Sequence, residues 1–203
     1  MSSTYFDQSS STYSHSCKTG IHGFFKSKEA KGILKVTEKY YPHSFEGKML
    51  DVGCGPGYYS SALRPIYRSL HLTGVDPSQG MIEQYRQLGL RGVHSSLEDM
   101  ADRSIEFFDI ILCFGVLEFV DDIDRFTQSL KVLSRKESTL FIIAPKLNLI
   151  SLSYFLHHKL RNKIHMRFVS RYIRSFESQG FKIVERRALT FISELLVFKI
   201  EKK

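Results

Sequence analysis

Short apolar runs alternate with segments of helical periodicity along most of the chain. The apolar runs have the length of buried strands, and several are nearly continuous, which is typical of parallel strands covered on both faces. The predicted strands are 48–53, 70–76, 92–95, 107–114, 138–144, 181–186 and 191–200. The predicted helices are 27–41, 58–66, 79–88, a segment from Asp121 or Asp122 to about Leu133, 149–160 and 168–179.

The alternation of strands with helices predicts an α/β fold. It is typical of a doubly wound, Rossmann-like open sheet that is mostly parallel and has helices on both faces. In such sheets ligands bind outside the carboxyl ends of the strands. Candidate chemistry is therefore expected where the apolar runs end.

An acidic residue and three alternating glycines follow the first predicted strand: Asp51, Gly53, Gly55 and Gly57. A dinucleotide fingerprint needs its third glycine at position 58, which is Tyr58. The Gly-Lys-Ser/Thr of a phosphate-binding P-loop is also absent from this segment. A carboxylate at this place would repel a pyrophosphate. The motif therefore favours a ligand with positive charge.

These residues resemble the first motif of class I S-adenosylmethionine-dependent methyltransferases, an apolar strand followed by Asp/Glu-x-Gly-x-Gly-x-Gly. The similarity covers about residues 47–145, and its nearest group is the small-molecule enzymes that include the ubiquinone-pathway O-methyltransferases. Asp76 at the end of the second strand matches the acid that binds the ribose hydroxyls. Segments 96–99 and 108–118 resemble the third and fourth motifs.

The resemblance implies seven strands with an antiparallel last strand, and S-adenosylmethionine as cofactor. It implies a set of cofactor contacts that combines the glycine loop, the ends of the next strands and the start of the helix after the second strand. These residues are Asp51, Gly53, Cys54, Gly55, Gly57, Asp76, Pro77, Met81, Leu97, Glu98, Cys113 and Phe114. Two alternatives stay open: Asp76 as a helix cap acting through Pro77 and Ser78, and Glu98 as an ordinary loop acid.

Methyl transfer to a hydroxyl acceptor requires a base, for which Glu118, His22 and His158 are candidates. Glu118 ends the fourth motif, and the histidines lie before and after the region of resemblance. An acidic run begins at Glu118 and continues with Asp121, Asp122 and Asp124. It has the ligand type of a hard cation, but helix capping explains it more simply, and no metal is predicted.

A length of 203 residues and a mass of 23.5 kDa suit one domain. We expect residues 1–46 to form a helical cap over the substrate and residues 47–203 the cofactor-binding domain, with an insertion at 146–180 as a second cover. Cys17, Cys54 and Cys113 lie too far apart to indicate a disulfide framework or a zinc site, which favours the cytoplasm. Neither a signal pattern nor a membrane-spanning apolar run is evident.

The net charge is +8, and no acidic residue occurs between Glu137 and Glu177. We call the basic residues of this stretch the basic block: Lys146, Lys159, Arg161, Lys163, Arg167, Arg171 and Arg174, with His157, His158 and His165. Such a block suggests a phosphate-bearing substrate, an acidic carrier protein, an anionic membrane surface or RNA. A solvated helix face is the simpler alternative.

The sequence thus predicts in-line methylation of an oxygen atom on a small acceptor, amphiphilic or bound to a carrier. The segment 113–116 lacks the Asp/Asn-Pro-Pro-Tyr/Phe motif common in nucleobase amino methylation. Two alternatives remain, an RNA methyltransferase that uses the basic block and a catalytically silent subunit that binds the cofactor. The sequence leaves the oligomeric state open.

Overall fold

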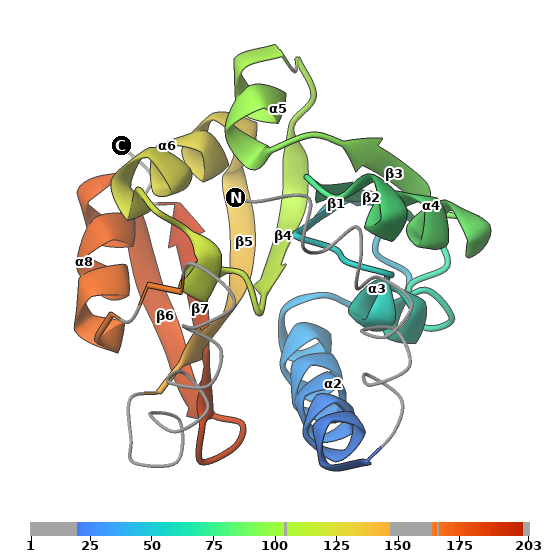
Figure 1. Cartoon of the computed structure of the whole chain (residues 1–203), viewed down its shortest axis with the longest axis horizontal. Helices are drawn as coiled ribbons and strands as arrows, with labels where there is room; N and C mark the ends of the chain where they lie inside the picture. Colours follow the sequence, from blue (N-terminus) through green and yellow to red (C-terminus); the bar gives the residue numbers. More distant parts are fainter. Residues whose placement is uncertain (1–19, 104, 147–163, 166, 201–203) are drawn as a thin grey trace. The chain divides into compact units, whose positions relative to one another are not determined.

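Figure 1 shows the computed structural model of the chain, which describes residues 20–103, 105–146, 164–165 and 167–200. The strands are β1 (Gly47–Val52), β2 (Leu70–Asp76), β3 (Arg91–His94), β4 (Phe108–Phe114), β5 (Ser134–Pro145), β6 (Phe181–Ala188) and β7 (Ser193–Ile200). The helices are α2 (Gly20–Tyr40), α3 (Tyr58–Leu63), α4 (Gln79–Gln87), α5 (Leu97–Arg103), η1 (Leu117–Phe119, one 3₁₀ turn), α6 (Ile123–Leu133) and α8 (Val169–Ser178).

The seven strands form one sheet in the order β3-β2-β1-β4-β5-β7-β6. β2 runs parallel to β1 and β3, and β4 runs parallel to β5. β7 runs antiparallel to both β5 and β6. The Rossmann-like sheet with an antiparallel last strand, predicted from the sequence, is confirmed.

Contacts between residues group the chain into two compact units, which divide between Ser96 and Leu97. The N-terminal unit contains α2, β1–β3, α3 and α4, and the C-terminal unit contains the remaining elements. The predicted boundary between residues 46 and 47 stays a prediction, although α2 falls in the same unit as β1.

In the N-terminal unit, β1 is buried from Met49 to Val52, and β2 is buried at every position except His71. Helix α4 packs on β2 and β3 through its buried face, which includes Met81, Ile82 and Tyr85. Helix α2 begins at Gly20, earlier than the predicted start at residue 27, and buries Ile33 and Val36. The short third strand and the end of α4 before Gly89 agree with the prediction.

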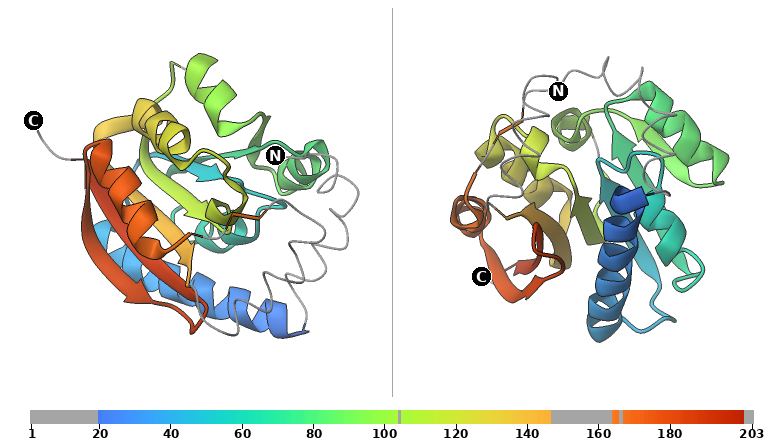
Figure 2. Two further views of the ribbon diagram at one scale, coloured as in Figure 1. Left: turned by 60° about the vertical axis from the view of Figure 1, so that its left-hand side comes forward. Right: turned by 60° about the horizontal axis from the view of Figure 1, so that its bottom comes forward.

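In the C-terminal unit, helix α8 lies against β6 and β5, as Figures 1 and 2 show. Phe176 of α8 stacks on Phe198 of β7 with ring centroids 4.6 Å apart. Two elements differ from the prediction. Residues 97–103 form a helix where loop acids were considered. Strand β5 begins at Ser134, directly after α6, and its first four residues, which are not buried, precede the predicted start at residue 138.

The predicted helix at 149–160 lies outside the described residues. Among those that are described, no helix combines the length and the apolar character that a membrane crossing requires.

Candidate active site

The loop after β1 is shaped by its three glycines. Gly53, Gly55 and Gly57 have φ values of 60°, 51° and 85°. These values lie in the left-handed region, which residues with a Cβ enter at a cost of about 1–2 kcal/mol each. The loop is closed by hydrogen bonds from the Gly57 amide to the Cys54 carbonyl (3.0 Å) and from the Cys54 amide to the Val75 carbonyl of β2 (3.2 Å). The motif therefore builds a tight turn fixed to the end of β2.

Asp51 begins a buried chain of hydrogen bonds beneath this loop. Its side chain is 3% exposed, and its Oδ2 accepts a hydrogen bond from Ser60 Oγ of α3 at 2.7 Å. Ser60 in turn accepts from the Tyr85 hydroxyl of α4 at 2.9 Å. Three elements thus orient one carboxylate. Sequence reasoning missed Ser60 and Tyr85, since neither belongs to the glycine motif and only the packing of α4 brings the tyrosine to this place.

Gly74 of β2 makes room for this chain. A Cβ at this position would lie 2.6 Å from Tyr85 Cζ and 2.7 Å from Cys54 Sγ. Both neighbours are buried, so neither can move without disturbing the core. The absence of a side chain in β2 is therefore what allows the tyrosine ring to reach Ser60.

Burial raises the pKa of Asp51 from 3.8 to about 7. The Ser60 hydrogen bond lowers the pKa, the charge of Asp76 raises it, and the positive charge of Lys26 lowers it, but burial has the largest effect. A cation bound beside this carboxylate would offset the cost of its charge. The donor and acceptor groups of the site therefore fit a ligand with a positively charged end.

Asp76 joins the glycine loop to the start of α4. Its Oδ2 accepts from the Gly55 amide at 3.0 Å, and its Oδ1 accepts from the Ser78 amide at 2.9 Å. The helix itself is capped by Ser78, whose Oγ accepts from the Met81 amide at 3.3 Å. Asp76 thus supports the helix start through Ser78, and its ribose-binding role stays a prediction.

A second polar chain connects α2 to α3. Lys26 Nζ donates to the Tyr59 hydroxyl at 3.1 Å, and this hydroxyl donates to Glu29 Oε2 at 2.7 Å. Lys26 Nζ also lies 4.9 Å from the centroid of the Tyr59 ring. Tyr59 and Glu29 are buried, and burial raises the pKa of Tyr59 well above its usual value, so its hydroxyl keeps its proton.

Cys54, Pro77 and Met81 complete the predicted contacts in this unit. Burial, followed by the nearby charges of Asp51 and Asp76, holds the pKa of the Cys54 thiol well above its usual value, so the thiol is not an activated nucleophile. Met81 is buried and Pro77 is partly exposed. Their contacts with a cofactor stay predictions.

The remaining predicted contacts lie in the C-terminal unit. Leu97, Cys113 and Phe114 are buried, whereas Glu98 is partly exposed in the first turn of α5. Their contacts with the cofactor also stay predictions. The interpretation of Glu98 as a loop acid is wrong, because residues 97–103 are helical.

Glu118 lies in η1 and is partly exposed, and its charge acts on Tyr172 of α8, which sequence reasoning missed. Its backbone carbonyl accepts from the His165 amide at 2.7 Å. Burial, and then the negative charge of Glu118, raise the pKa of Tyr172 to about 12, while the Arg167 guanidinium opposes this shift. Of the other candidate bases, His22 lies in α2 with its side chain outside the description, and His158 lies outside the described residues.

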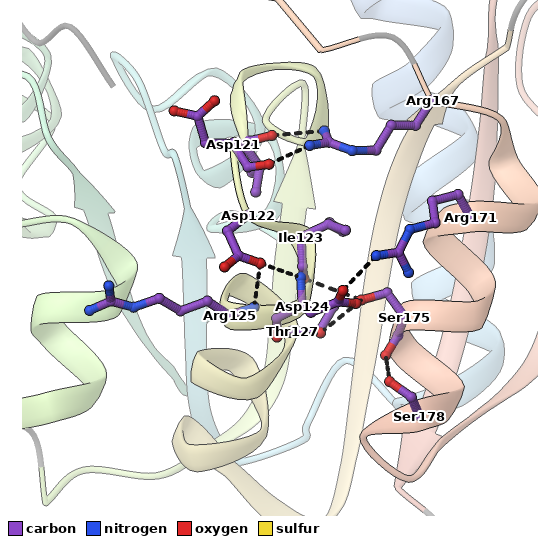
Figure 3. Close-up of polar contacts among 11 residues, drawn as sticks. Asp121, Asp122, Ile123, Asp124, Arg125, Thr127, Arg167, Arg171, Ser175 and Ser178 are labelled. Carbon is purple, nitrogen blue, oxygen red and sulfur yellow. Dashed lines mark hydrogen bonds and ion pairs between the residues drawn. The ribbon is translucent and has the colours of Figure 1, made fainter.

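Of the rest of the acidic run, Asp122 caps α6 and Asp124 joins α6 to α8 (Figure 3). Asp122 caps α6 by accepting from the Asp124 and Arg125 amides, both at 3.0 Å. Asp124 accepts from Ser175 Oγ at 2.6 Å and from Arg171 Nη2 at 2.5 Å. Helix capping therefore explains Asp122. Within the described ranges, no group of three or more potential ligand side chains forms a metal site.

Two arginines of the basic block have acceptors within the protein. Arg171 pairs with Asp124, and Arg167 donates to the backbone carbonyls of Val120 at 2.7 Å and Asp121 at 2.5 Å (Figure 3). These two side chains hold α8 to the residues around the start of α6. The part of the block available to an anionic partner is correspondingly smaller than the sequence suggests.

The fold and the acid–glycine loop together define a Rossmann-like domain that binds a cofactor with a cationic end. A family profile described as "Methyltransferase domain" matches residues 13–186. The chain belongs to this family, and it is a class I S-adenosylmethionine-dependent methyltransferase domain.

Proteins of known sequence or structure resemble the chain over different lengths. It is 31% identical over 99 residues to a probable (S)-tetrahydroprotoberberine N-methyltransferase 2 of Papaver bracteatum, covering 46% of this chain and 28% of that protein. It is 33% identical over 81 residues to a ubiquinone biosynthesis O-methyltransferase of Hahella chejuensis, covering 37% of this chain and 33% of that protein. The chain thus spans about a third or less of these two relatives' own length.

Among solved structures, magnesium protoporphyrin IX methyltransferase from Synechocystis PCC 6803 with bound SAH matches with a TM-score of 0.76. The sequence identity is 14%, and the match covers 98% of this chain and 97% of the other. At this identity the likeness supports the fold.

Proposed function

We propose that this domain transfers a methyl group from S-adenosylmethionine to an oxygen atom of a small organic acceptor. The observation that carries the proposal is the buried Asp51 carboxylate, held by Ser60 at the base of a glycine turn and lacking a strong cationic partner among the residues that shift its pKa. When bound, the cofactor supplies a methyl group already activated by the positive charge on sulfur.

The residues of the N-terminal unit hold the cofactor. Asp51 attracts its cationic amino-acid end, and the glycine turn allows close approach of the backbone. Asp76 accepts hydrogen bonds from the ribose hydroxyls, since each oxygen of a carboxylate can accept more than one. Met81 packs on the adenine. The contribution to catalysis is orientation, because alignment of donor and acceptor lowers the barrier by several kcal/mol.

Glu118 is the proposed general base for the acceptor. A phenol or alcohol keeps its proton at neutral pH, so its methylation needs a group that accepts the proton. Of the three candidate bases, Glu118 is the one whose side chain lies within the described residues, and its negative charge contributes to the raised pKa of the Tyr172 hydroxyl. A base of this kind favours an oxygen acceptor over an amine that is already neutral.

The proposed acceptor is amphiphilic or attached to an acidic carrier. The similarity to a ubiquinone biosynthesis O-methyltransferase supports an oxygen acceptor. Within the described residues, no ion pair engages Lys146 or Arg174 of the basic block. Three further cations of the block, Lys159, Arg161 and Lys163, lie outside the described residues. These cations would attract an acceptor that carries acidic groups.

The test is incubation of the protein with methyl-labelled cofactor and separate pools of phenols, acyl-carrier conjugates and RNA. We expect a base-labile or ether-linked methyl group in a small-molecule or carrier pool. Glu118→Gln is expected to lower kcat by about 10²–10⁴-fold while the affinity for the cofactor stays unchanged. The control is Glu177→Gln, an exposed residue of α8 outside the predicted contacts, which leaves kcat unchanged. Label in RNA alone, or normal turnover by Glu118→Gln, would contradict the proposal.

A further inference from the structure

The ring of Tyr85 is enclosed by the backbone of β2 and of the glycine turn. A Cβ on Gly74 would lie 2.6 Å from its Cζ, and a Cβ on Gly57 would lie 3.0 Å from its Cδ2. The side chain is fully buried, and α4, which carries it, packs on β2. The position of the tyrosine hydroxyl is therefore set by the two glycines against which the ring packs.

Two neighbouring serines of α3 use their hydroxyl groups differently. Ser61 donates to the carbonyl of Gly57, four residues earlier, at 2.7 Å, which is the usual local bond of a helical serine. Ser60 instead donates to Asp51 Oδ2 at 2.7 Å and accepts from the Tyr85 hydroxyl at 2.9 Å. Burial raises the pKa of Tyr85, so its hydroxyl keeps its proton and remains a donor. Because Tyr85 occupies a lone pair of Ser60, the single Ser60 proton is directed toward Asp51.

The two oxygen atoms of Asp51 have different roles. Oδ2 accepts from Ser60, whereas Oδ1 accepts no hydrogen bond from the residues that the structure describes. The side chain is 3% exposed, so bulk water does little to orient it. The orientation of the carboxylate therefore depends on the Ser60 hydroxyl, and Oδ1 is the oxygen left for a ligand.

The hydrogen bond from Ser60 also has a large effect on the charge of Asp51. It lowers the pKa of Asp51 more than any other contribution does, and only burial, which raises the pKa, has a larger effect. Asp76 of β2 and Lys26 of α2 act on Asp51 through their charges, with smaller and opposite effects. Cys54 keeps its proton, because burial raises the pKa of its thiol.

We propose that Tyr85 and Ser60 are positioning residues of the cofactor site: the tyrosine hydroxyl directs the Ser60 proton, and Ser60 holds Oδ2 of Asp51 so that Oδ1 is available to the cationic end of S-adenosylmethionine. Without the tyrosine hydroxyl, Ser60 is free to turn to a carbonyl of its own helix, as Ser61 does, and Asp51 loses its hydrogen bond. This inference rests on the proposed role of Asp51 in cofactor binding.

The first experiment measures S-adenosylmethionine binding by calorimetry in wild type, Tyr85→Phe, Ser60→Ala and the double variant. Tyr85→Phe, which keeps the ring, is expected to weaken binding about threefold to tenfold, the effect of one neutral hydrogen bond. Ser60→Ala is expected to weaken binding about tenfold to 100-fold, because the bond that it removes has a charged acceptor. The double variant is expected to bind as Ser60→Ala does, since the tyrosine acts through the serine.

The matched control is Tyr67→Phe. Tyr67 is a buried tyrosine of the same unit, and its hydroxyl donates to the Tyr41 carbonyl at 3.4 Å, outside the hydrogen-bond chain of Asp51. This variant is expected to bind the cofactor as wild type does. If Tyr85→Phe weakens binding equally in the presence and absence of the Ser60 hydroxyl, the tyrosine does not act through the serine, and the inference is overturned.

The second experiment follows the ionisation of Asp51 in the cofactor-free protein. The carboxyl carbons of aspartate are labelled with ¹³C, and the Asp51 signal is assigned by its loss in Asp51→Asn. A hydrogen bond donated to a carboxylate lowers its pKa, so the midpoint is expected to move to higher pH in Tyr85→Phe and further in Ser60→Ala. Tyr67→Phe is expected to keep the wild-type midpoint. An unchanged midpoint in Tyr85→Phe would overturn the inference.

The two experiments separate this inference from the proposed function. If wild type binds no cofactor, the proposed function fails, whereas the carbon titration still decides whether Tyr85 acts on Asp51 through Ser60. If wild type binds the cofactor and both Tyr85→Phe and Ser60→Ala bind it equally well, the inference fails and the proposed function stands.

Discussion

At the residue scale, the proposed binding role of Asp51 is in conflict with the stability of the cofactor-free fold. Its folded-state pKa of about 7 lies above the ordinary value of 3.8, so the folded state binds the proton more tightly than the unfolded state does. By linkage, its contribution to stability is present below about pH 4 and is lost as the pH rises through about 7. A ligand cation would offset this cost.

Replacing Asp51 by Asn tests this conflict. At pH 8 the variant is expected to have a free energy of unfolding about 1–3 kcal/mol higher than wild type, because a buried charge is removed and the amide oxygen still accepts from Ser60. At pH 4, close to the ordinary pKa of 3.8, the difference is expected to be small. Urea titrations at both pH values measure it, with the exposed Asp102→Asn as control. Equal effects at both pH values would show that Asp51 is not buried in a charged form.

At the element scale, strand β2 and helix α4 position the side chains around Asp51, and polar contacts join α6 to α8. The sequence patterns predicted both pairs of elements, because their apolar positions follow strand and helix periods. The contacts between elements were not predictable. Gly74, Ser60 and Tyr85 meet only after α4 has packed on the sheet, and Arg171 finds Asp124 far away in the sequence.

A methyl group at Gly74 is expected to disturb the packing of α4 on β2. Gly74→Ala places a Cβ 2.6 Å from Tyr85 Cζ, which should destabilise the protein by about 1–3 kcal/mol and weaken cofactor binding by displacing the Ser60–Asp51 pair. Gly92→Ala is the matched control, since its Cβ would meet the Ile82 side chain at 3.1 Å. Thermal unfolding and calorimetry compare the two. A smaller loss for Gly74→Ala than for Gly92→Ala would contradict the account.

The link between α6 and α8 is expected to depend on pH. Hydrogen bonds from Arg171 and Ser175 lower the pKa of Asp124 below its ordinary value, so its contribution is present above about pH 4 and is lost as the pH falls through the lowered pKa. A double-mutant cycle with Asp124→Asn and Arg171→Met is expected to show favourable coupling at pH 7 that disappears at low pH. Additive effects at pH 7 would show that the pair contributes nothing.

At the scale of the whole molecule, the sequence predicted most of what defines the class of protein. The positions and approximate bounds of the seven strands along the chain follow from apolar runs, whereas the antiparallel last strand and the cofactor followed from the family resemblance of the acid–glycine motif. The exception at α5 arose because residues 97–103 are short and rich in acids, so their apolar positions give a weak helical signal. The sequence overstated how many cations of the basic block are available to a partner, because composition cannot show that Arg167 and Arg171 bind acceptors within the fold.

The central claim is that Asp51 and the glycine turn bind the sulfonium cofactor. Calorimetric titration of S-adenosylmethionine into wild type and Asp51→Ala at pH 8 tests it most directly, with NADH as a second ligand. The account predicts saturable binding to wild type, no measurable binding to Asp51→Ala and no binding of NADH to either. A variant that titrates like wild type, or a wild type that binds NADH in place of the sulfonium, would contradict the account.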